Sequence, residues 1–196
     1  MITIDEKYKP TGERYETALA KYREFLDRIE NRAEQVKKFV QWLENKTSWL
    51  WSPASTRFHL NIPGGLLIHS VGVTETLLKI RDTLAPRYSD ESCIIVALFH
   101  DVGKVGEENN PYYIPDPHYK GNDIKYVSNP EVTAMGIAVR SLYIVGQFIP
   151  LSAEESQAIC YHDGQYIPEN RPVALKEKPL LLMLHYADLW TASVLE

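Results

Sequence analysis

Hydrophobic side chains recur at helical spacing along most of the chain, and they predict a nearly all-α fold. In residues 1–46 the intervals alternate between four and three, which is a heptad pattern and predicts one long helix with Thr11 as its N-terminal cap. This helical extension either packs on the core of its own chain or pairs with a second copy in a homodimer. The apolar positions of the pattern are Tyr15, Leu19, Tyr22, Leu26, Ile29, Ala33, Val36, Val40 and Leu43.

The remaining residues, 47–196, are expected to form one domain of further helices. Pro53 and Pro63 mark a loop before the first of them, Ser152 is placed to cap a later one, and Pro179 opens the last. Two short runs, 112–114 and 124–127, favour a β-hairpin, and 164–178 reads as loop. The predicted helices cover about residues 66–84, 90–102, 130–148, 153–162 and 179–194.

Composition narrows the class of protein. The 196 residues carry 21 Lys and Arg against 26 Asp and Glu, a net charge of −5, which argues against a protein that grips long nucleic acid. The apolar runs are too short to cross a membrane, and the first residues lack the layout of a signal peptide. Cys93 and Cys160 lie in apolar stretches and are expected to be reduced thiols. We therefore expect a cytoplasmic protein.

Polar side chains interrupt three apolar helices. Residues 93–99 are continuously apolar and lead directly into His100 and Asp101, which would be costly to bury without a compensating partner. Two neighbouring side chains of this kind can both reach one cation. His69 interrupts the apolar face of the helix before it, and Asp188 that of the last helix. Each residue alone is typical of a satisfied core position, but their occurrence on three separate helices indicates a metal site.

In this order, these residues resemble the HD superfamily of metal-dependent phosphohydrolases. The matching pieces are residues 63–70 (PGGLLIHS), 97–104 (ALFHDVGK) and 187–188, and the resemblance spans about residues 50–194. Residues 53–59 also look like the segment that leads into the HD domain in relatives that process nucleic acids.

The resemblance implies a ligand set and a reaction. His69, His100, Asp101 and Asp188 would bind one divalent transition metal, and Mn, Fe, Co, Ni and Zn all suit such a mixed set. Metal-bound water would then attack phosphorus. Asp101 would hold or deprotonate that water as well as bind the metal, and Lys104 would stabilise charge on the phosphate.

Other residues are assigned to the substrate. Relatives with two metals carry a further histidine where this chain has Asn129, so a single metal is expected and His162 is left to touch substrate phosphate. Arg57 and His59 lie in the loop before His69; an arginine there suits a phosphate, although a helix-capping or salt-bridge role is equally consistent. Tyr166 belongs to a group of loop tyrosines that either stack a base or fix their loops.

Three residues have alternatives that the pattern leaves open. Glu107 and Glu108 either relay a proton to the leaving group or are solvated loop acids. His185 lies one turn before Asp188 and either supports a metal ligand from behind or contacts the site directly.

Three functions follow in order of preference. The first is hydrolysis of a phosphate ester of a nucleotide or similar small phosphorylated metabolite. The second is an HD-type nuclease that trims DNA or RNA ends. The third is a non-catalytic regulatory module that keeps the metal site and works through the N-terminal helix.

Overall fold

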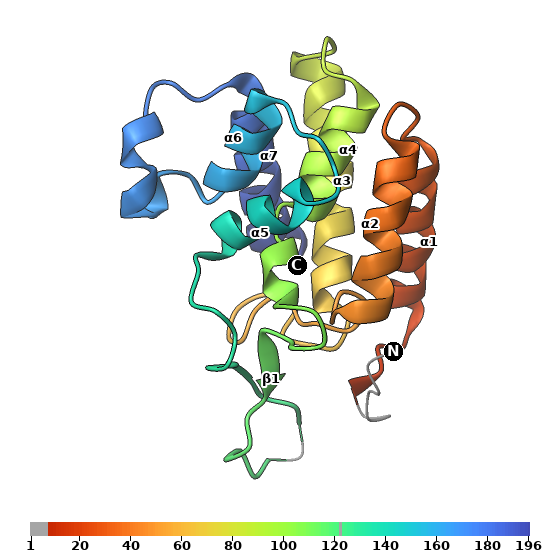
Figure 1. The fold of residues 1–196 in the computed structure, drawn as a ribbon, viewed down its shortest axis with the longest axis vertical. Coiled ribbons are helices and arrows are strands. Elements are labelled where there is room, and N and C mark those ends of the chain that lie inside the picture. Colours follow the sequence, from red (N-terminus) through yellow and green to blue (C-terminus); the bar gives the residue numbers. More distant parts are fainter. Residues whose placement is uncertain (1–7, 122) are drawn as a thin grey trace.

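The helices of this chain pack side by side, with one small hairpin below them (Figure 1). The computed structural model describes residues 8–121 and 123–196. The nearly all-α fold is confirmed, as is the short hairpin. The α-helices are α1 (Glu13–Asp27), α2 (Ala33–Lys46), α3 (Gly65–Leu84), α4 (Asp90–Phe99), α5 (Ile137–Gly146), α6 (Ala153–Tyr161) and α7 (Pro179–Trp190).

The predicted single N-terminal helix is wrong, because the segment folds as α1 and α2 with a turn at residues 28–32. Side chains of α4 and α6 hold this turn through hydrogen bonds. The guanidinium of Arg32 donates to Glu91 Oε1 at 2.6 Å and to Glu155 Oε1 at 2.7 Å, and the backbone N–H of Asn31 donates to Glu91 Oε2 at 2.8 Å. Thr11 is not the cap either, since Gly12 occupies that position with a φ of 102° and without a side-chain cap.

Both arms of this helix pair face the same core. Tyr22, Phe39 and Leu43 are fully buried and belong to one hydrophobic cluster with residues of α3, α4, α6 and α7. Figure 1 shows α1 and α2 side by side along one flank of the bundle. Six of the nine heptad residues are thus buried in the core of their own chain, Leu19 and Leu26 pack against it partly buried, and Ala33 is exposed. Pairing of this segment with a second copy stays a prediction.

The predicted helix at 130–148 begins only at Ile137. Residues 130–136 are instead tied into loops: the backbone N–H of Thr133 donates to Glu107 Oε1 at 3.0 Å, and its carbonyl accepts from Arg140 Nη2 at 2.7 Å. The predicted cap at Ser152 is confirmed, with a reciprocal capping box to Glu155.

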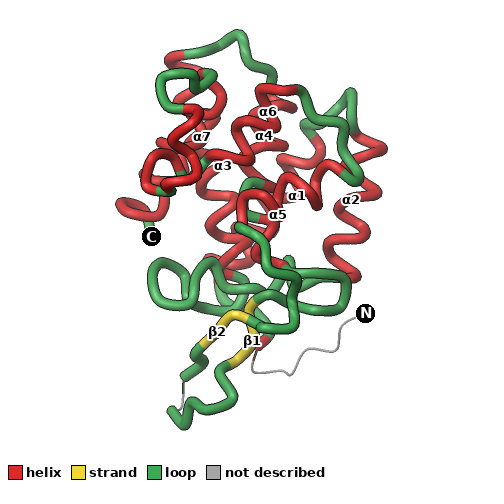
Figure 2. The backbone as a smooth tube through the Cα atoms, turned by 60° about the vertical axis from the view of Figure 1, so that its left-hand side comes forward, coloured by secondary structure: helices red, strands yellow, loops and turns green. Residues whose placement is uncertain are grey.

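Shorter elements complete the chain. α4 ends at Phe99 and is followed by a 3₁₀ turn, Val102–Val105. Two more 3₁₀ turns, Gly164–Tyr166 and Pro168–Val173, lie in the segment that was expected to be loop, and α7 continues into a π-helical turn, Thr191–Leu195. The hairpin strands β1 (Tyr113–Pro115) and β2 (Tyr126–Ser128) are antiparallel and lie below the helices (Figure 2).

Two observations bear on the expectations drawn from composition. In the described part of the chain, no helix combines the length and the apolar character that a membrane span requires. Cys93 and Cys160 are both free thiols, the first buried and the second half-buried.

Candidate metal centre

Four helices bring polar side chains to one buried point. His69 lies in the first turns of α3, His100 and Asp101 directly follow α4, and His162 directly follows α6. Asp188 comes from the last turn of α7. All four helices contribute apolar side chains to one hydrophobic core, and α6 contributes the fewest of the four. We call these five residues the His/Asp cluster.

The distances within the cluster suit a shared metal ion. His69 Nε2 lies 3.1 Å from Asp188 Oδ1 and 3.7 Å from Asp101 Oδ2. His100 Nε2 lies 3.5 Å from Asp101 Oδ2 and 3.9 Å from Asp188 Oδ1. Ligand atoms held about 2 Å from one ion are separated by roughly 3 to 4 Å. The four residues predicted as metal ligands are therefore brought together with their donor atoms at coordination spacing.

The side chains of the cluster are buried, and some of their polar atoms have no hydrogen-bond partner within the described residues. His69 and His100 have no solvent exposure, and Asp101 is 4% exposed. The Nε2 atoms of both histidines are buried and make no hydrogen bond within the described residues. Leaving a buried polar atom unsatisfied costs about 1 to 3 kcal/mol, so two such atoms aimed at the same point favour a bound cation. These buried His and Asp groups can hold a metal ion.

The far side of each histidine ring is fixed by an acceptor. Nδ1 of His100 donates to the carbonyl oxygen of Ala97 at 2.7 Å, and Nδ1 of His162 donates to that of Ile159 at 2.9 Å. Because a carbonyl only accepts, Nδ1 of each ring carries a proton and Nε2 faces the cluster. Rings that bind metals are commonly oriented in this way.

Burial and neighbouring charges shift the pKa values of the three histidines in opposite directions. Burial lowers the pKa of His100 to about 4, so this ring is neutral near pH 7. Burial also disfavours charge on His69, but the carboxylates of Asp188 and Glu196 outweigh it and raise the pKa to about 9. The pKa of His162 rises to about 9 in the same way, because Asp101 outweighs burial.

The carboxylates stay ionised. Burial alone would raise the pKa of Asp101, but the Lys104 ammonium and the neighbouring imidazoles of His100 and His162 hold it well below its usual range. Burial is likewise outweighed at Asp188, chiefly by His69, and its pKa is lowered. Lys104 Nζ donates directly to Asp101 Oδ2, and this carboxylate keeps the pKa of the lysine raised despite burial.

His162 approaches the cluster from a different side. Its Nε2 lies 3.6 Å from Asp101 Oδ1, whereas His69 and His100 face the other carboxylate oxygen, Oδ2. Behind it, its carbonyl oxygen is 2.7 Å from Nδ1 of His185. This contact holds His185 against the backbone of His162, and His185 also lines the cavity at the cluster, so both alternatives for that residue stay predictions.

The cluster opens into a cavity of about 840 Å³. Lys104 and His162 line it beside the metal-binding groups, as do His59 and Tyr166. Tyr166 is 77% exposed and stands at the opening. Arg57 is exposed and does not belong to this lining, although its neighbours in the loop do.

Glu107 and Glu108 lie elsewhere. Glu107 accepts from the backbone of Thr133, and Glu108 pairs with Lys46. Both line a separate cavity with Trp42. A proton relay from either residue to the candidate metal centre is not supported by this placement.

Glu196 is the residue that sequence reasoning missed. Its carboxylate lies 3.1 and 3.3 Å from Nδ1 of His69, on the opposite side of the ring from the metal-binding atoms. Its side chain is 2% exposed. Helical spacing gave no clear signal for it, because eight residues at the regular period of 3.6 end about 80° around the helix from Asp188.

The chain was compared with known proteins at three levels. Models of protein families, curated proteins and solved structures all gave no significant match.

Proposed function

We propose that this chain is an HD-type, metal-dependent phosphohydrolase that cleaves a phosphate ester of a nucleotide or of a similar small phosphorylated molecule. The observation that carries the proposal is the buried His/Asp cluster, which opens into a cavity beside a lysine. The order of His69, His100, Asp101 and Asp188 along the chain, with the residues around them, resembles that of the HD superfamily.

The residues fit a transition metal better than magnesium or calcium. His69 and His100 offer imidazole nitrogen, and Asp101 and Asp188 offer carboxylate oxygen. Magnesium and calcium prefer sites made of oxygen alone, whereas Mn, Fe, Co, Ni and Zn accept the mixed set. When bound, such an ion activates water at neutral pH and polarises a phosphoryl oxygen.

Three side chains at the candidate metal centre have separate roles in the proposed reaction. Lys104 is a cation in the cavity wall whose side chain is 12% exposed, and it compensates negative charge on the phosphate. Asp101, held ionised, accepts a hydrogen bond from the attacking water. His162 lines the cavity with its Nε2 3.6 Å from Asp101 Oδ1, a position from which it can form a hydrogen bond to a phosphate or leaving-group oxygen.

The shape and charge of the cavity favour a small substrate. Its outer wall carries apolar and aromatic side chains, among them Phe58, Val139 and Tyr166, and a nucleobase can stack on such surfaces. Among the described residues that line it, Lys104 is the only lysine and there is no arginine, while Asp163 and Glu169 add negative charge. A nucleic-acid strand would need a basic path to the centre.

The test is hydrolysis measured on two panels in the presence of Mn, Co, Ni or Zn. One panel holds ribo- and deoxyribonucleoside mono- and triphosphates, and the other short single-stranded oligonucleotides. A variant with His100→Ala and Asp101→Ala is the blank. The proposal expects phosphate release from the nucleotide panel alone. Shortening of the oligonucleotides would establish a nuclease activity instead. No hydrolysis on either panel, with metal bound to the chain, would favour the regulatory module.

A variant of the outer wall tests the nucleotide assignment separately. Tyr166→Ala should raise KM for a nucleotide severalfold, because one stacked base contributes about 1 to 3 kcal/mol. It should leave hydrolysis of p-nitrophenyl phosphate unchanged. An equal effect on both substrates would remove Tyr166 from base recognition.

A further inference from the structure

We infer that Glu196 is a positioning residue of the candidate metal centre, which orients His69 and strengthens its binding to the metal. The inference rests on the metal site of the proposed function, but it does not depend on which reaction the site performs. It concerns the side of His69 that faces away from the ion.

His69 is held between two sets of carboxylates. On one side, its Nε2 faces Asp188 at 3.1 Å and Asp101 at 3.7 Å. On the other side, its Nδ1 faces both oxygens of Glu196. Because an ionised carboxylate only accepts hydrogen bonds, the Glu196 contact places a proton on Nδ1 and leaves the Nε2 lone pair for the metal.

The comparison with the other two histidines isolates what is particular to Glu196. His100 and His162 also donate from Nδ1, but their acceptors are neutral backbone carbonyls of the preceding helical turn. Only His69, among these three, donates to a charged side chain. A carboxylate raises the basicity of the imidazole that it holds, so His69 becomes the stronger nitrogen ligand.

Local structure shows how Glu196 reaches this place. After α7 the chain widens into the π-helical turn Thr191–Leu195, and the backbone N–H of Glu196 donates to the carbonyl of Thr191 at 3.2 Å. The Thr191 hydroxyl donates to that of Thr76 on α3 at 3.1 Å. Turns of this kind are frequent at functional sites.

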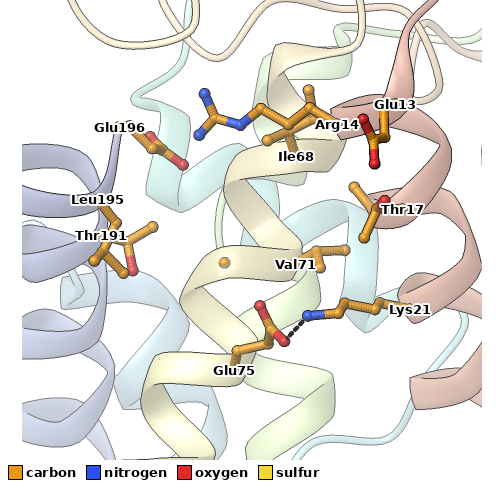
Figure 3. Close-up of a pocket in the computed structure, with 12 residues that line it drawn as sticks. Glu13, Arg14, Thr17, Lys21, Ile68, Val71, Glu75, Thr191, Leu195 and Glu196 are labelled. Carbon is orange, nitrogen blue, oxygen red and sulfur yellow. Dashed lines mark hydrogen bonds and ion pairs between the residues drawn. The ribbon is translucent and has the colours of Figure 1, made fainter.

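A glycine makes the approach feasible. At Gly72 on α3, a Cβ would lie 2.9 Å from Thr191 Cγ2, closer than real side chains pack. Gly72 therefore lets the π-helical turn sit against α3, with Glu196 beside His69. Figure 3 shows Thr191, Leu195 and Glu196 along one wall of a groove, opposite Glu13 and Thr17 of α1.

The position of His59 gives the Glu196 carboxylate an alternative role, as a ligand of a second metal ion. Its Nε2 is buried, is 4.0 Å from Glu196 Oε2 and has no hydrogen-bond partner within the described residues. Its ring centre is 4.7 Å from that of His69. His59, His69 and Glu196 could thus hold an ion of their own. In that case Glu196 would be a ligand and not a positioning residue, and the stoichiometry of metal binding decides between the two.

The experiment compares Zn²⁺ affinity and stoichiometry, by chelator competition on the full chain, among the wild type, Glu196→Ala and Glu196→Gln. We expect one ion per chain in all three. Glu196→Ala should weaken binding 10- to 100-fold. Glu196→Gln should weaken it less, because its amide oxygen still accepts from Nδ1–H. Glu75→Gln is the matched control, since Glu75 lines the same groove and pairs with Lys21; it should stay within twofold of the wild type.

A spectroscopic signal separates positioning from general support of the fold. In the Zn²⁺-loaded wild type, imidazole-tuned ¹H–¹⁵N spectra should show a slowly exchanging Nδ1–H of His69. Glu196→Ala should lose that signal and keep those of His100 and His162. An unchanged signal with affinity within twofold of the wild type would overturn the inference. So would a second bound ion that disappears with Glu196. Because the readout is metal binding, its failure is distinguishable from an absence of hydrolysis.

Discussion

Raising the pH should destabilise the chain when metal is removed, because two buried histidines hold protons that the unfolded chain would release. The pKa values of His69 and His162 are raised to about 9 in the folded, metal-free chain, from an ordinary value near 6.5. The stabilisation from a raised histidine pKa is fully present below pH 6.5 and is lost as the pH rises through 9. The window of interest is therefore pH 6.5 to 9.

The other titratable groups of the cluster do not change their protonation between pH 6.5 and 9. The pKa of His100 is lowered, so its effect on stability falls below pH 6.5. The pKa values of Asp101 and Asp188 are lowered as well, and both remain ionised throughout the window. Lys104 has a raised pKa and stays charged. The change in stability between pH 6.5 and 9 should thus report mainly on His69 and His162.

The magnitude follows from the size of the shifts. One pKa unit corresponds to about 1.4 kcal/mol, so a shift from 6.5 to about 9 corresponds to about 3 kcal/mol for one histidine. His69 and His162 draw on the same small group of carboxylates, so we expect about 3 kcal/mol in total and not twice that value. For a chain of this size, that is a fall in Tm of roughly 6 to 12 °C.

The assay is thermal unfolding followed by circular dichroism in the presence of a chelator, at steps from pH 6.5 to 9. Replacing His162 by Gln should remove about half of the fall, whereas His118→Gln, at an exposed position, should leave it intact. In the metal-loaded chain His69 gives up its Nε2 proton, so the gain in Tm on adding metal should grow with pH. A metal-free Tm that is flat across the window would refute the reasoning.

Three further predictions concern single residues. Lys104→Ala should lower turnover at least about 100-fold while metal content, measured by mass spectrometry, is unchanged; loss of the metal would mean that the lysine only supports Asp101. Arg32→Ala should lower the free energy of unfolding by about 3 to 5 kcal/mol, because it leaves the buried Glu155 carboxylate without a cationic partner; a urea titration that shows less than about 1 kcal/mol would contradict this. Ser152→Ala removes the capping box of α6 and should reduce the free energy of unfolding by about 1 kcal/mol in the same titration, and no measurable loss would show that the cap is dispensable.

The metal-binding residues could be predicted because they break an otherwise strong pattern. A polar pair after seven apolar residues, as at His100 and Asp101, is expensive to bury, and the same conflict recurs at His69 and Asp188. Each conflict is local and visible in the sequence. Their meeting in space follows from each helix turning its apolar side inward, which carries the polar exceptions to the same interior point.

The N-terminal helix pair could not be predicted in the same way. A heptad pattern continues across residues 28–32, and the same apolar spacing serves one long helix or two helices that face one core. What decides is the contact of Arg32 with Glu91 and Glu155, which lie 59 and 123 residues away in the sequence. A local sequence pattern cannot predict that Arg32 has partners so far away along the chain.

Glu196 was missed for a related reason. A glutamate near an exposed valine and leucine looks like a solvated position, and only the π-helical turn Thr191–Leu195 brings it beside His69. That turn departs from the regular 3.6-residue period on which helix predictions depend. Arg57 shows the opposite case: its chemistry suits a phosphate, but its side chain is exposed and lies outside the lining of the cavity.

The central claim is that the His/Asp cluster holds one divalent transition metal. The most direct test is the metal content of the purified full chain after dialysis against Mn, Fe, Co, Ni and Zn in turn, measured by native mass spectrometry. The account predicts one tightly bound ion per chain, and its loss from the variant with His100→Ala and Asp101→Ala while the helical circular-dichroism spectrum is kept. A wild-type chain that retains no ion from any of the five metals would contradict it.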